Sequence, residues 1–359
     1  MCLLKVALVF PNNLYTSPYL PYYTQLLDKE NVAYDIISWN RNDRVEQGTV
    51  AFTLKNKKGP KVLRILDYFK FRKFALRELE KNNYDKVIVF TCQLGIYLQG
   101  YLKKNFPKKY ILDIRDYSPM VPYFKNKIGK LIEHAHWVSL SSNGFKSWLP
   151  TGSRYMLSHN VNIELVEEAL QTEEVKNPLF LKKAILVDTI GQIKDFPSDA
   201  EVVMVLGNDA RFQLNFIGFG PTSAKLEEFA IKEKIKNVDF SGPYKKEEEK
   251  NLLKETDLIN ILISNNTFNN QVLSNRLYLS ALLKIPCMVN DYTVEQQKII
   301  DHFKFGIVIK DYEQIPDEIL RFKEQYNPEK FKEACTTFLK EVRKDYELFE
   351  SNLRTFIGA

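Results

Sequence analysis

Two carboxylates and an arginine stand within four residues of one another in the segment Asp113-Ile114-Arg115-Asp116. The apolar run before them, Tyr110 to Leu112, predicts a strand, so the charged groups fall at the carboxyl end of that strand. Charges in such a place are costly unless they pair with one another or with a ligand. The segment therefore predicts either a binding site or an internal salt bridge that fastens the following loop.

Polar residues also follow two other predicted strands of the first half. Asn12 and Asn13 come after the first strand, where they either contact a ligand or satisfy a turn. His159 follows the strand Tyr155 to Leu157 and is either a donor to a ligand or a structural histidine. The loop after the first strand lacks a glycine-rich cradle, which argues against a standard dinucleotide enzyme.

The second half places glycines and cations after successive predicted strands. Glycine permits close approach of a ligand to the backbone, and lysine is a point charge suited to a diphosphate. A serine cap opens a short helix there, and such a helix start can receive phosphate. The candidate ligand-binding residues are Gly191, Lys194, Gly218, Gly220, Val238, Tyr244, Ser274, Asn275, Arg276 and Leu277.

No metal site is predicted. His134 and His136 form an H-x-H pair, but no third ligand accompanies them. No D-x-D sequence stands at the end of a predicted strand. A diphosphate bound here would therefore be neutralised by side-chain cations and a helix dipole rather than by a metal ion.

Short apolar runs alternate with longer helical patterns along the whole chain. Several runs are nearly continuous in apolar residues, which is typical of parallel strands covered on both faces. Both halves therefore predict doubly wound, Rossmann-like α/β units with a cleft between them. The expected strands are 5–10, 34–38, 86–90, 110–113, 137–140 and 155–157, then 184–187, 214–217, 238–240, 258–263, 286–289 and 306–309.

The length of 359 residues favours two domains. An acidic stretch without strand character, residues 161–177, predicts the boundary. We expect an N-terminal domain of residues 1–165, a second domain of residues 166–335, and a C-terminal helix of residues 336–359 that crosses back to the first domain.

Composition and charge indicate where the chain works. The four cysteines form no C-x-x-C pair, which favours a reducing cytoplasm, and no window approaches the roughly 18 apolar residues of a membrane span. The net charge of +6 is concentrated between Lys55 and Lys81, where apolar residues are interleaved. This segment predicts either a basic amphipathic helix on anionic lipid or a surface helix packed on its own sheet. No nucleic-acid motif accompanies the charge, so no nucleic-acid partner is expected.

The order of these features resembles the GT-B glycosyltransferases, in particular the retaining, family 4-like enzymes that build bacterial capsules, exopolysaccharides and lipopolysaccharides. The glycine turns at Gly191 and Gly218, the segment 237–242, the block Asn275-Arg276-Leu277-Tyr278 and the following Lys284-Ile285-Pro286 carry the resemblance. The D-I-R-D element at Asp113 adds to it.

The resemblance implies metal-independent transfer of a sugar from a nucleoside-diphosphate donor, without a further cofactor, to a hydroxyl of a lipid-linked or oligosaccharide acceptor. The second domain would bind the donor, with Lys194 and the segment Ser274 to Leu277 at the phosphates and Val238 near the base. The first would bind the acceptor, with Asn12, Asn13 and Arg115 in the cleft. Asp113, Asp116 or His159 would orient the acceptor hydroxyl.

One position departs from the family pattern. Leu279 stands where a glutamate usually contacts the donor, and Gln271 occupies the earlier acidic position. A leucine accepts no hydrogen bond from a ribose or sugar hydroxyl. A non-catalytic GT-B-shaped partner of a transferase, or a sugar-nucleotide epimerase, therefore stays open beside a membrane-associated polysaccharide glycosyltransferase.

Overall fold

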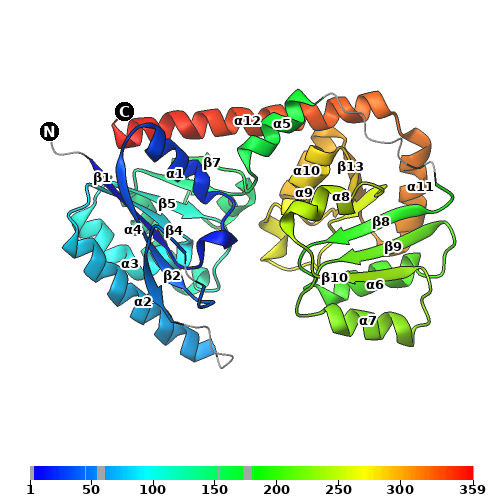
Figure 1. Ribbon diagram of the computed structural model, residues 1–359, viewed down its shortest axis with the longest axis horizontal. Coiled ribbons are helices and arrows are strands. Elements are labelled where there is room, and N and C mark those ends of the chain that lie inside the picture. Colours follow the sequence, from blue (N-terminus) through cyan, green and yellow to red (C-terminus); the bar gives the residue numbers. More distant parts are fainter. Residues whose placement is uncertain are drawn as a thin grey trace. The chain divides into compact units, whose positions relative to one another are not determined.

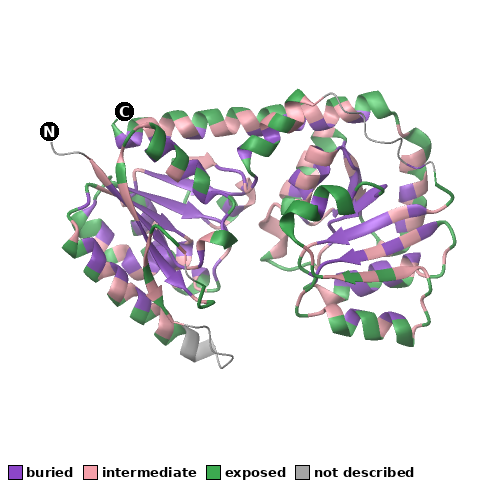
Figure 2. Ribbon diagram, in the orientation of Figure 1, coloured by how far each residue is buried: buried purple, intermediate pink, exposed green. Residues whose placement is uncertain are grey.

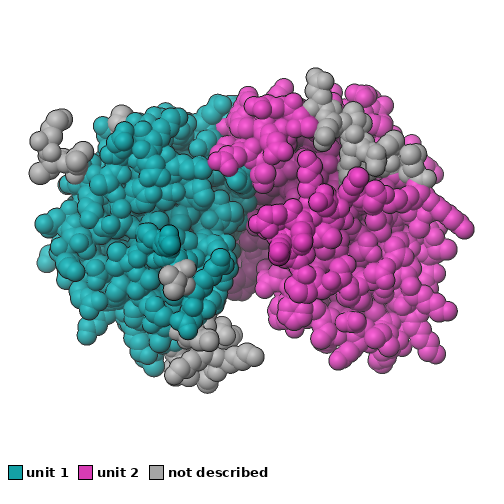
Figure 3. Space-filling model, viewed as in Figure 1, with its two compact units in different colours: residues 1–162, 344–359 teal, residues 163–343 magenta. Residues whose placement is uncertain are grey.

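The chain divides into two compact units. The computed structural model describes residues 4–44, 46–54, 61–152, 154–172, 180 and 182–358. Unit 1 comprises Met1–Asn162 with Lys344–Ala359, and unit 2 comprises Ile163–Arg343 (Figure 3). Each unit is described by itself.

Unit 1 is built on a parallel sheet of seven strands in the order β3-β2-β1-β4-β5-β6-β7 (Figure 1). The chain adds β2 and β3 on one side of β1 and then returns to add β4 to β7 on the other side. The switch point of the sheet therefore lies between β1 and β4. The strands are β1 (Lys5–Phe10), β2 (Ala33–Asn40), β3 (Thr49–Thr53), β4 (Lys86–Phe90), β5 (Tyr110–Ile114), β6 (Trp137–Leu140) and β7 (Tyr155–Leu157).

Helices cover both faces of this sheet (Figure 1). On one face lie α2 (Lys61–Lys81), α3 (Cys92–Asn105) and α4 (Lys125–His134), and on the other lies α1 (Leu20–Lys29). The central strands are almost wholly buried as a result, which explains their continuous apolar sequence (Figure 2).

Unit 2 repeats the plan with six parallel strands in the order β10-β9-β8-β11-β12-β13, and its switch point lies between β8 and β11. Its strands are β8 (Ile185–Ile190), β9 (Phe212–Ile217), β10 (Val238–Gly242), β11 (Leu258–Asn260), β12 (Cys287–Asn290) and β13 (Gly306–Ile309). Its helices are α5 (Ile163–Gln171), α6 (Phe196–Leu206), α7 (Ser223–Lys232), α8 (Glu249–Leu252), α9 (Asn275–Leu283), α10 (Val294–Phe303) and α11 (Ile315–Gln325).

A long C-terminal helix, α12 (Pro328–Ile357), belongs to both units. In unit 2 the ring of Phe338 lies against Phe305 and Tyr278. In unit 1 the ring of Phe349 lies 5.1 Å from that of Tyr23, and Phe356 packs beside Trp137. The apolar stripe of the sequence is therefore divided between two cores.

The predicted fold is confirmed: two doubly wound parallel sheets and a C-terminal helix that returns to the first unit. All twelve expected strands are present, although the strand expected over 258–263 ends at Asn260. The edge strand β3 was not predicted, because Thr49–Thr53 is short and half exposed. Residues 55–60 of the basic segment and 173–177 of the expected boundary lie outside the described residues.

We expect the substitution Phe349→Ala to lower the free energy of unfolding of unit 1 by about 3–5 kcal/mol, because the ring is 1% exposed and its removal leaves a cavity. All three tryptophans, Trp39, Trp137 and Trp148, lie in unit 1, so urea unfolding followed by tryptophan fluorescence reports on that unit. The neighbouring Leu348, 56% exposed, is the control, and Leu348→Ala should change stability by less than about 0.5 kcal/mol. Equal effects of the two substitutions would contradict the packing of Phe349 in the core of unit 1.

Candidate functional site

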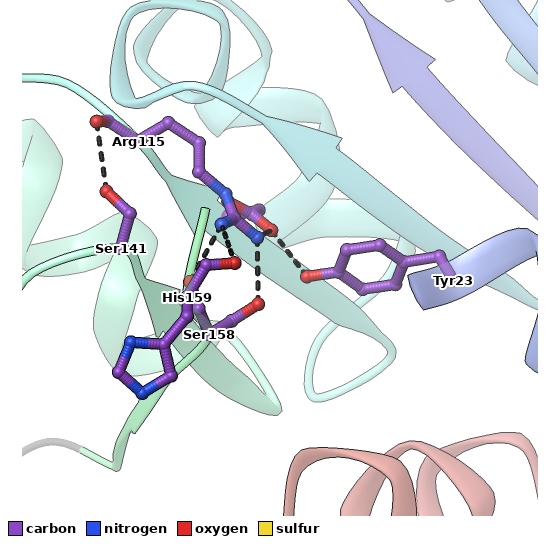
Figure 4. A network of polar contacts seen from close by, with 6 residues as sticks. Tyr23, Arg115, Ser141, Ser158 and His159 are labelled. Carbon is purple, nitrogen blue, oxygen red and sulfur yellow. Dashed lines mark hydrogen bonds and ion pairs between the residues drawn. The ribbon is translucent and has the colours of Figure 1, made fainter. Parts of the chain in front are cut away.

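A buried ion pair stands at the carboxyl end of β5 (Figure 4). Nε and Nη2 of Arg115 donate to the two carboxylate oxygens of Asp113 at 2.5 and 2.7 Å. Nη1 and Nη2 also donate to the backbone oxygen and the hydroxyl of Ser158, at 2.8 and 2.9 Å. The hydroxyl of Tyr23 in α1 donates to the same carboxylate at 2.5 Å. The network therefore joins β5 to the segment after β7 and to α1.

The surroundings of this network favour the charged form of Arg115 and the neutral form of Tyr23. Burial disfavours the cation, but the adjacent Asp113 carboxylate outweighs burial and raises the pKa of Arg115 above its ordinary value. Burial and the same carboxylate keep the pKa of Tyr23 well above its ordinary value. Both members of the pair have their hydrogen-bonding groups occupied, so the salt bridge that the sequence left open is present. Asp113 and Arg115 support the strand ends.

His159 lies beside this network. Its backbone oxygen accepts from Arg115, and its ring Nε2 lies 3.0 Å from the carboxylate of Asp345 in α12. The ring is almost fully buried. The position of His159 therefore ties the segment after β7 to the C-terminal helix.

A cavity of about 330 Å³ opens at the carboxyl ends of β1, β4 and β5. This is the switch point of the sheet, the place where open α/β sheets bind ligands. Its lining comes from four regions of unit 1: Phe10–Asn12 with Thr16 and Tyr19, Arg41 with Tyr68, Thr91–Gln93, and Arg115–Pro119 with Asn160.

The helix α3 begins at this cavity in an unusual backbone conformation. Thr91, its N-cap, has a φ of 75°, and its hydroxyl accepts from the amide of Leu94 at 3.3 Å. A β-branched residue adopts a positive φ only where the surrounding structure imposes it. Here the Thr91 amide donates to the backbone oxygen of Asp113 at 2.7 Å, which holds the start of α3 against β5.

The two loop asparagines have different environments. Asn13 is fully buried: its amide nitrogen donates to Asn40, and its amide oxygen accepts from the backbone of Arg41. Its side chain therefore ties the loop after β1 to the loop after β2. Asn12 lines the cavity, and its side-chain oxygen accepts from the amide of Asn13. Sequence reasoning missed Glu46, whose carboxylate accepts from the amides of Leu14 and Tyr15.

In unit 2 the glycines bring two loops into contact. A Cβ on Gly218 would lie 2.0 Å from the backbone oxygen of Gly191, and one on Gly220 would lie 2.0 Å from that of Ile193. Gly191 and Gly218 also have φ of 101° and 135°, which disfavour other residues. Packing of the loops after β8 and β9 is therefore sufficient reason for these glycines.

Arg276 spans the switch point of unit 2. Its Nε donates to the backbone oxygen of Ile190 at the end of β8, at 2.5 Å, and Nη1 donates to that of Asn260 at the end of β11, at 3.4 Å. Nη2 donates to the backbone oxygen of Gln192. Burial lowers the pKa of Arg276, and Asp199 opposes that effect. Because carbonyl oxygens carry no formal charge, the guanidinium keeps a net positive charge at the strand ends.

A second connection crosses the same edge of the sheet. Asp195, in the loop after β8, accepts from the amide and the hydroxyl of Ser264 and from the side chain of Asn269. The neighbouring Lys194 is exposed. Among the residues that the structure describes, Lys194 makes no hydrogen bond or ion pair, so its ammonium group is available to a ligand.

The start of α9 has the predicted cap. The hydroxyl of Ser274 accepts from the amide of Arg276 at 3.3 Å, and the amide of Ser274 donates to Gln296. Asn275 is exposed, whereas Leu277 is fully buried and has its amide bonded to the backbone oxygen of Ser274. Any contact of Leu277 with a ligand would be indirect.

The remaining two predicted residues lie at opposite ends of β10. Val238 is its first residue, at the amino end, and does not join the group around Arg276. Tyr244 follows the carboxyl end, and a Cβ on Gly191 would lie 3.9 Å from its hydroxyl. That hydroxyl donates to Glu249 at 2.7 Å. The structure thus groups Gly191, Tyr244 and the start of α9, and Lys194 belongs to the same loop as Gly191.

The described residues contain neither a metal-ion cluster nor a membrane-spanning helix. No cluster of three or more histidine, cysteine, aspartate or glutamate side chains there is placed to hold a metal ion. Within the same ranges, no helix has the length and apolar character needed to cross a bilayer.

Comparison with known proteins identifies the fold. No protein-family model and no curated protein sequence matches the chain. Among solved structures, sucrose-phosphate synthase from Thermosynechococcus elongatus is similar over 99% of both chains, with a TM-score of 0.70 at 12% identity. A glycosyltransferase from Rickettsia africae matches over 99% of both chains, with a TM-score of 0.65 at 11% identity. Anabaena HepE in complex with UDP matches over 98% of this chain and 100% of its own, with a TM-score of 0.68 at 12% identity. The chain has the GT-B fold.

The buried carboxylate beside Arg276 generates a pH prediction. Asp199, in the first turn of α6, is 3% exposed, and burial raises its pKa to about 7, although Arg276 opposes the shift. The unfolded value is about 3.9. The folded state therefore holds the proton more tightly, and the stability that this provides is fully present below about pH 4 and is lost as the pH rises through about 7.

We expect Asp199→Asn, which mimics the protonated form, to gain stability relative to the parent chain by up to about 1.4 kcal/mol per pH unit between about pH 4 and 7. Differential scanning calorimetry at about pH 5 and pH 8 measures this difference. Asp301→Asn, at an exposed position of α10, should show the pH dependence of the parent chain. A difference that stays constant with pH would contradict the prediction.

Proposed function

We propose that the protein is a retaining, metal-independent glycosyltransferase that moves a sugar from a nucleoside-diphosphate donor to a hydroxyl group. The GT-B fold over the whole chain supports this proposal, since the similar structures include HepE with UDP-glucose and the lipopolysaccharide galactosyltransferase WaaB. The single observation that carries it is the placement of Arg276 and Lys194 at the switch point of unit 2. Two cations there suit a diphosphate.

Unit 2 would bind the donor. The ammonium group of Lys194 and the start of α9, with Ser274 and Asn275, would contact the diphosphate, and Arg276 would hold the strand ends while adding positive charge. As the bond to the sugar breaks, negative charge grows on the leaving diphosphate. These fixed positive groups stabilise that charge more in the transition state than in the bound donor.

Unit 1 would bind the acceptor in its cavity, and we place the acceptor among lipid-linked saccharides or oligosaccharides of bacterial surface polysaccharide synthesis. Asp116 is exposed and lines the cavity, so its carboxylate would accept a hydrogen bond from the acceptor hydroxyl. Asp113 and His159 would act as positioning residues through Arg115 and α12, because both are buried.

A specific observation favours a second candidate function. Leu279 replaces the expected donor-contacting glutamate, and the guanidinium of Arg276 already donates to three backbone oxygens. A GT-B-shaped partner that binds a transferase without turning over a donor would tolerate both features. Binding of nucleotides separates the two functions.

We expect the full chain to bind a nucleoside diphosphate, with UDP, GDP and ADP as probes in isothermal titration calorimetry. Lys194→Ala should weaken that binding by about tenfold or more, because the loss of one charge-assisted contact is worth about 1.5–3 kcal/mol. Lys232→Ala, at an exposed lysine of α7, is the matched control and should bind as the parent chain does. Absence of binding to all three probes would favour the partner subunit.

We further propose that α2 attaches the protein to the inner face of the cytoplasmic membrane. Its buried side, with Phe71, Ala75 and Leu79, packs on unit 1, yet Ile65, Leu66 and Phe69 near its beginning are each about half exposed. Exposed basic residues, Lys70, Lys73 and Arg77, accompany them. Apolar side chains beside cations suit an anionic lipid surface.

We expect the chain to sediment with vesicles that contain anionic phosphatidylglycerol and to sediment poorly with neutral phosphatidylcholine vesicles. The double substitution Leu66→Gln, Phe69→Gln should reduce binding severalfold, because each removes an apolar side chain from the lipid contact. Ile231→Gln, which alters another exposed apolar residue, should have no effect. Binding that persists in the double variant would exclude α2 as the attachment site.

A further inference from the structure

We propose that the cavity of unit 1 takes an acceptor that carries an anionic group, a phosphate or a carboxylate, and that Arg41 recognises this group. The inference rests on the proposed function, because it names the acceptor class for the site that the transferase would use. It is carried by the environment of Arg41, which the sequence did not single out.

Arg41 follows β2 and lines the cavity. Its guanidinium lies over the ring of Trp39, with the central carbon 3.9 Å from the ring centroid, and 5.0 Å from that of Tyr68 in α2. The two rings meet edge to face at 82°, and both lie within cation–π distance of the guanidinium.

Two donors of this guanidinium are unmet. Nε and Nη2 of Arg41 are buried, and neither has a hydrogen-bond partner in the part of the chain that the structure describes. A buried donor of a charged group without an acceptor is costly, so such groups indicate a missing partner. An anion in the cavity would supply it after a rotation of the terminal side-chain torsions.

The same chain shows what partner these atoms prefer. In Arg115, Nε and Nη2 hold the two oxygens of the Asp113 carboxylate side by side. This side of a guanidinium binds carboxylate and phosphate in the same bidentate manner. Arg115 is therefore neutralised within the protein, whereas Arg41 has the same pair of nitrogens and no carboxylate partner among the described residues.

The other charges of the lining define the rest of the ligand. Asp116 also lines the cavity, and Arg115 is balanced by Asp113 behind it. One cation and one carboxylate suit a ligand with an anionic group at one position and hydroxyls at another, which describes a charged sugar. The volume of about 330 Å³ lies at the lower end of the roughly 300–1,000 Å³ of ligand pockets, which favours one sugar unit.

Calorimetry of the full chain with glucose 6-phosphate, glucuronate and glucose tests the proposal. We expect at least one of the two anions to bind tenfold or more tightly than glucose, and Arg41→Gln to abolish this preference. Arg41→Lys, which keeps the charge but loses the bidentate edge, should retain part of it. Arg44→Gln, an exposed arginine of the same loop that lies over Tyr15, should behave as the parent chain does.

A UDP titration of each variant reports on unit 2. Unchanged UDP binding in Arg41→Gln shows that the variant is folded. If the parent chain does not bind UDP at all, that result counts against the proposed function and not against the role of Arg41. Farnesyl diphosphate in detergent micelles distinguishes the sources: if it binds more tightly than glucose 6-phosphate, the anion belongs to a lipid carrier, and otherwise to the sugar. The proposal is overturned if glucose and both anions bind equally, or if the preference for an anion survives Arg41→Gln. It is also overturned if no anion binds with a Kd below about 1 mM.

Discussion

The buried pair of Asp113 and Arg115 is the interaction on which the cavity edge of unit 1 depends. It joins the end of β5 to the segment after β7 and, through Tyr23, to α1. Removal of one partner would leave the other charge buried and unpaired, which is far more costly than the net contribution of the intact pair. The charges of Asp113 and Arg115 satisfy one another within the protein. Asp116 and Arg41 line the cavity in front of them.

The charge of an arginine at the strand ends is arranged differently in unit 2. Parallel strands end with backbone oxygens at one edge. Arg276 donates to two of them across the switch point, those of Ile190 and Asn260, and to the backbone oxygen of Gln192 in the loop after β8. The acceptors are neutral, so the positive charge of Arg276 is not cancelled there as that of Arg115 is. The two arginines therefore give one unit an internally neutralised strand end and the other a cationic one. This difference accords with a diphosphate donor in unit 2 and a hydroxyl-bearing acceptor in unit 1.

The sequence predicted the strands well because buried parallel strands are continuous apolar runs, and it missed β3 because an edge strand needs no such run. It found the charged residues at strand ends but left their roles open, since burial and pairing of Asp113 depend on residues 45 positions away, such as Ser158. Arg41, Tyr68 and Glu46 carried no local signal, because their partners converge from separate loops. Val238 shows a different difficulty. It belongs to β10 as predicted, but as the first residue of that strand it lies at the amino end, away from the loops that follow the carboxyl ends.

The hydrogen bonds of Arg276 also indicate what consequence Leu279 has in place of a glutamate. If Arg276 contacted only the ligand, few groups fixed by the protein would hold the sugar donor. The glutamate would then be one of these few groups, and its absence would matter more. Arg276 instead bonds to the backbone of unit 2, and Asp195 and the capped start of α9 are likewise held by hydrogen bonds, so this edge of the sheet keeps its form and charge without that glutamate. The absent carboxylate would then affect how firmly a sugar or ribose hydroxyl is held, rather than whether a diphosphate is bound. Under the proposed function, binding of the nucleotide and transfer of the sugar would thus be separable.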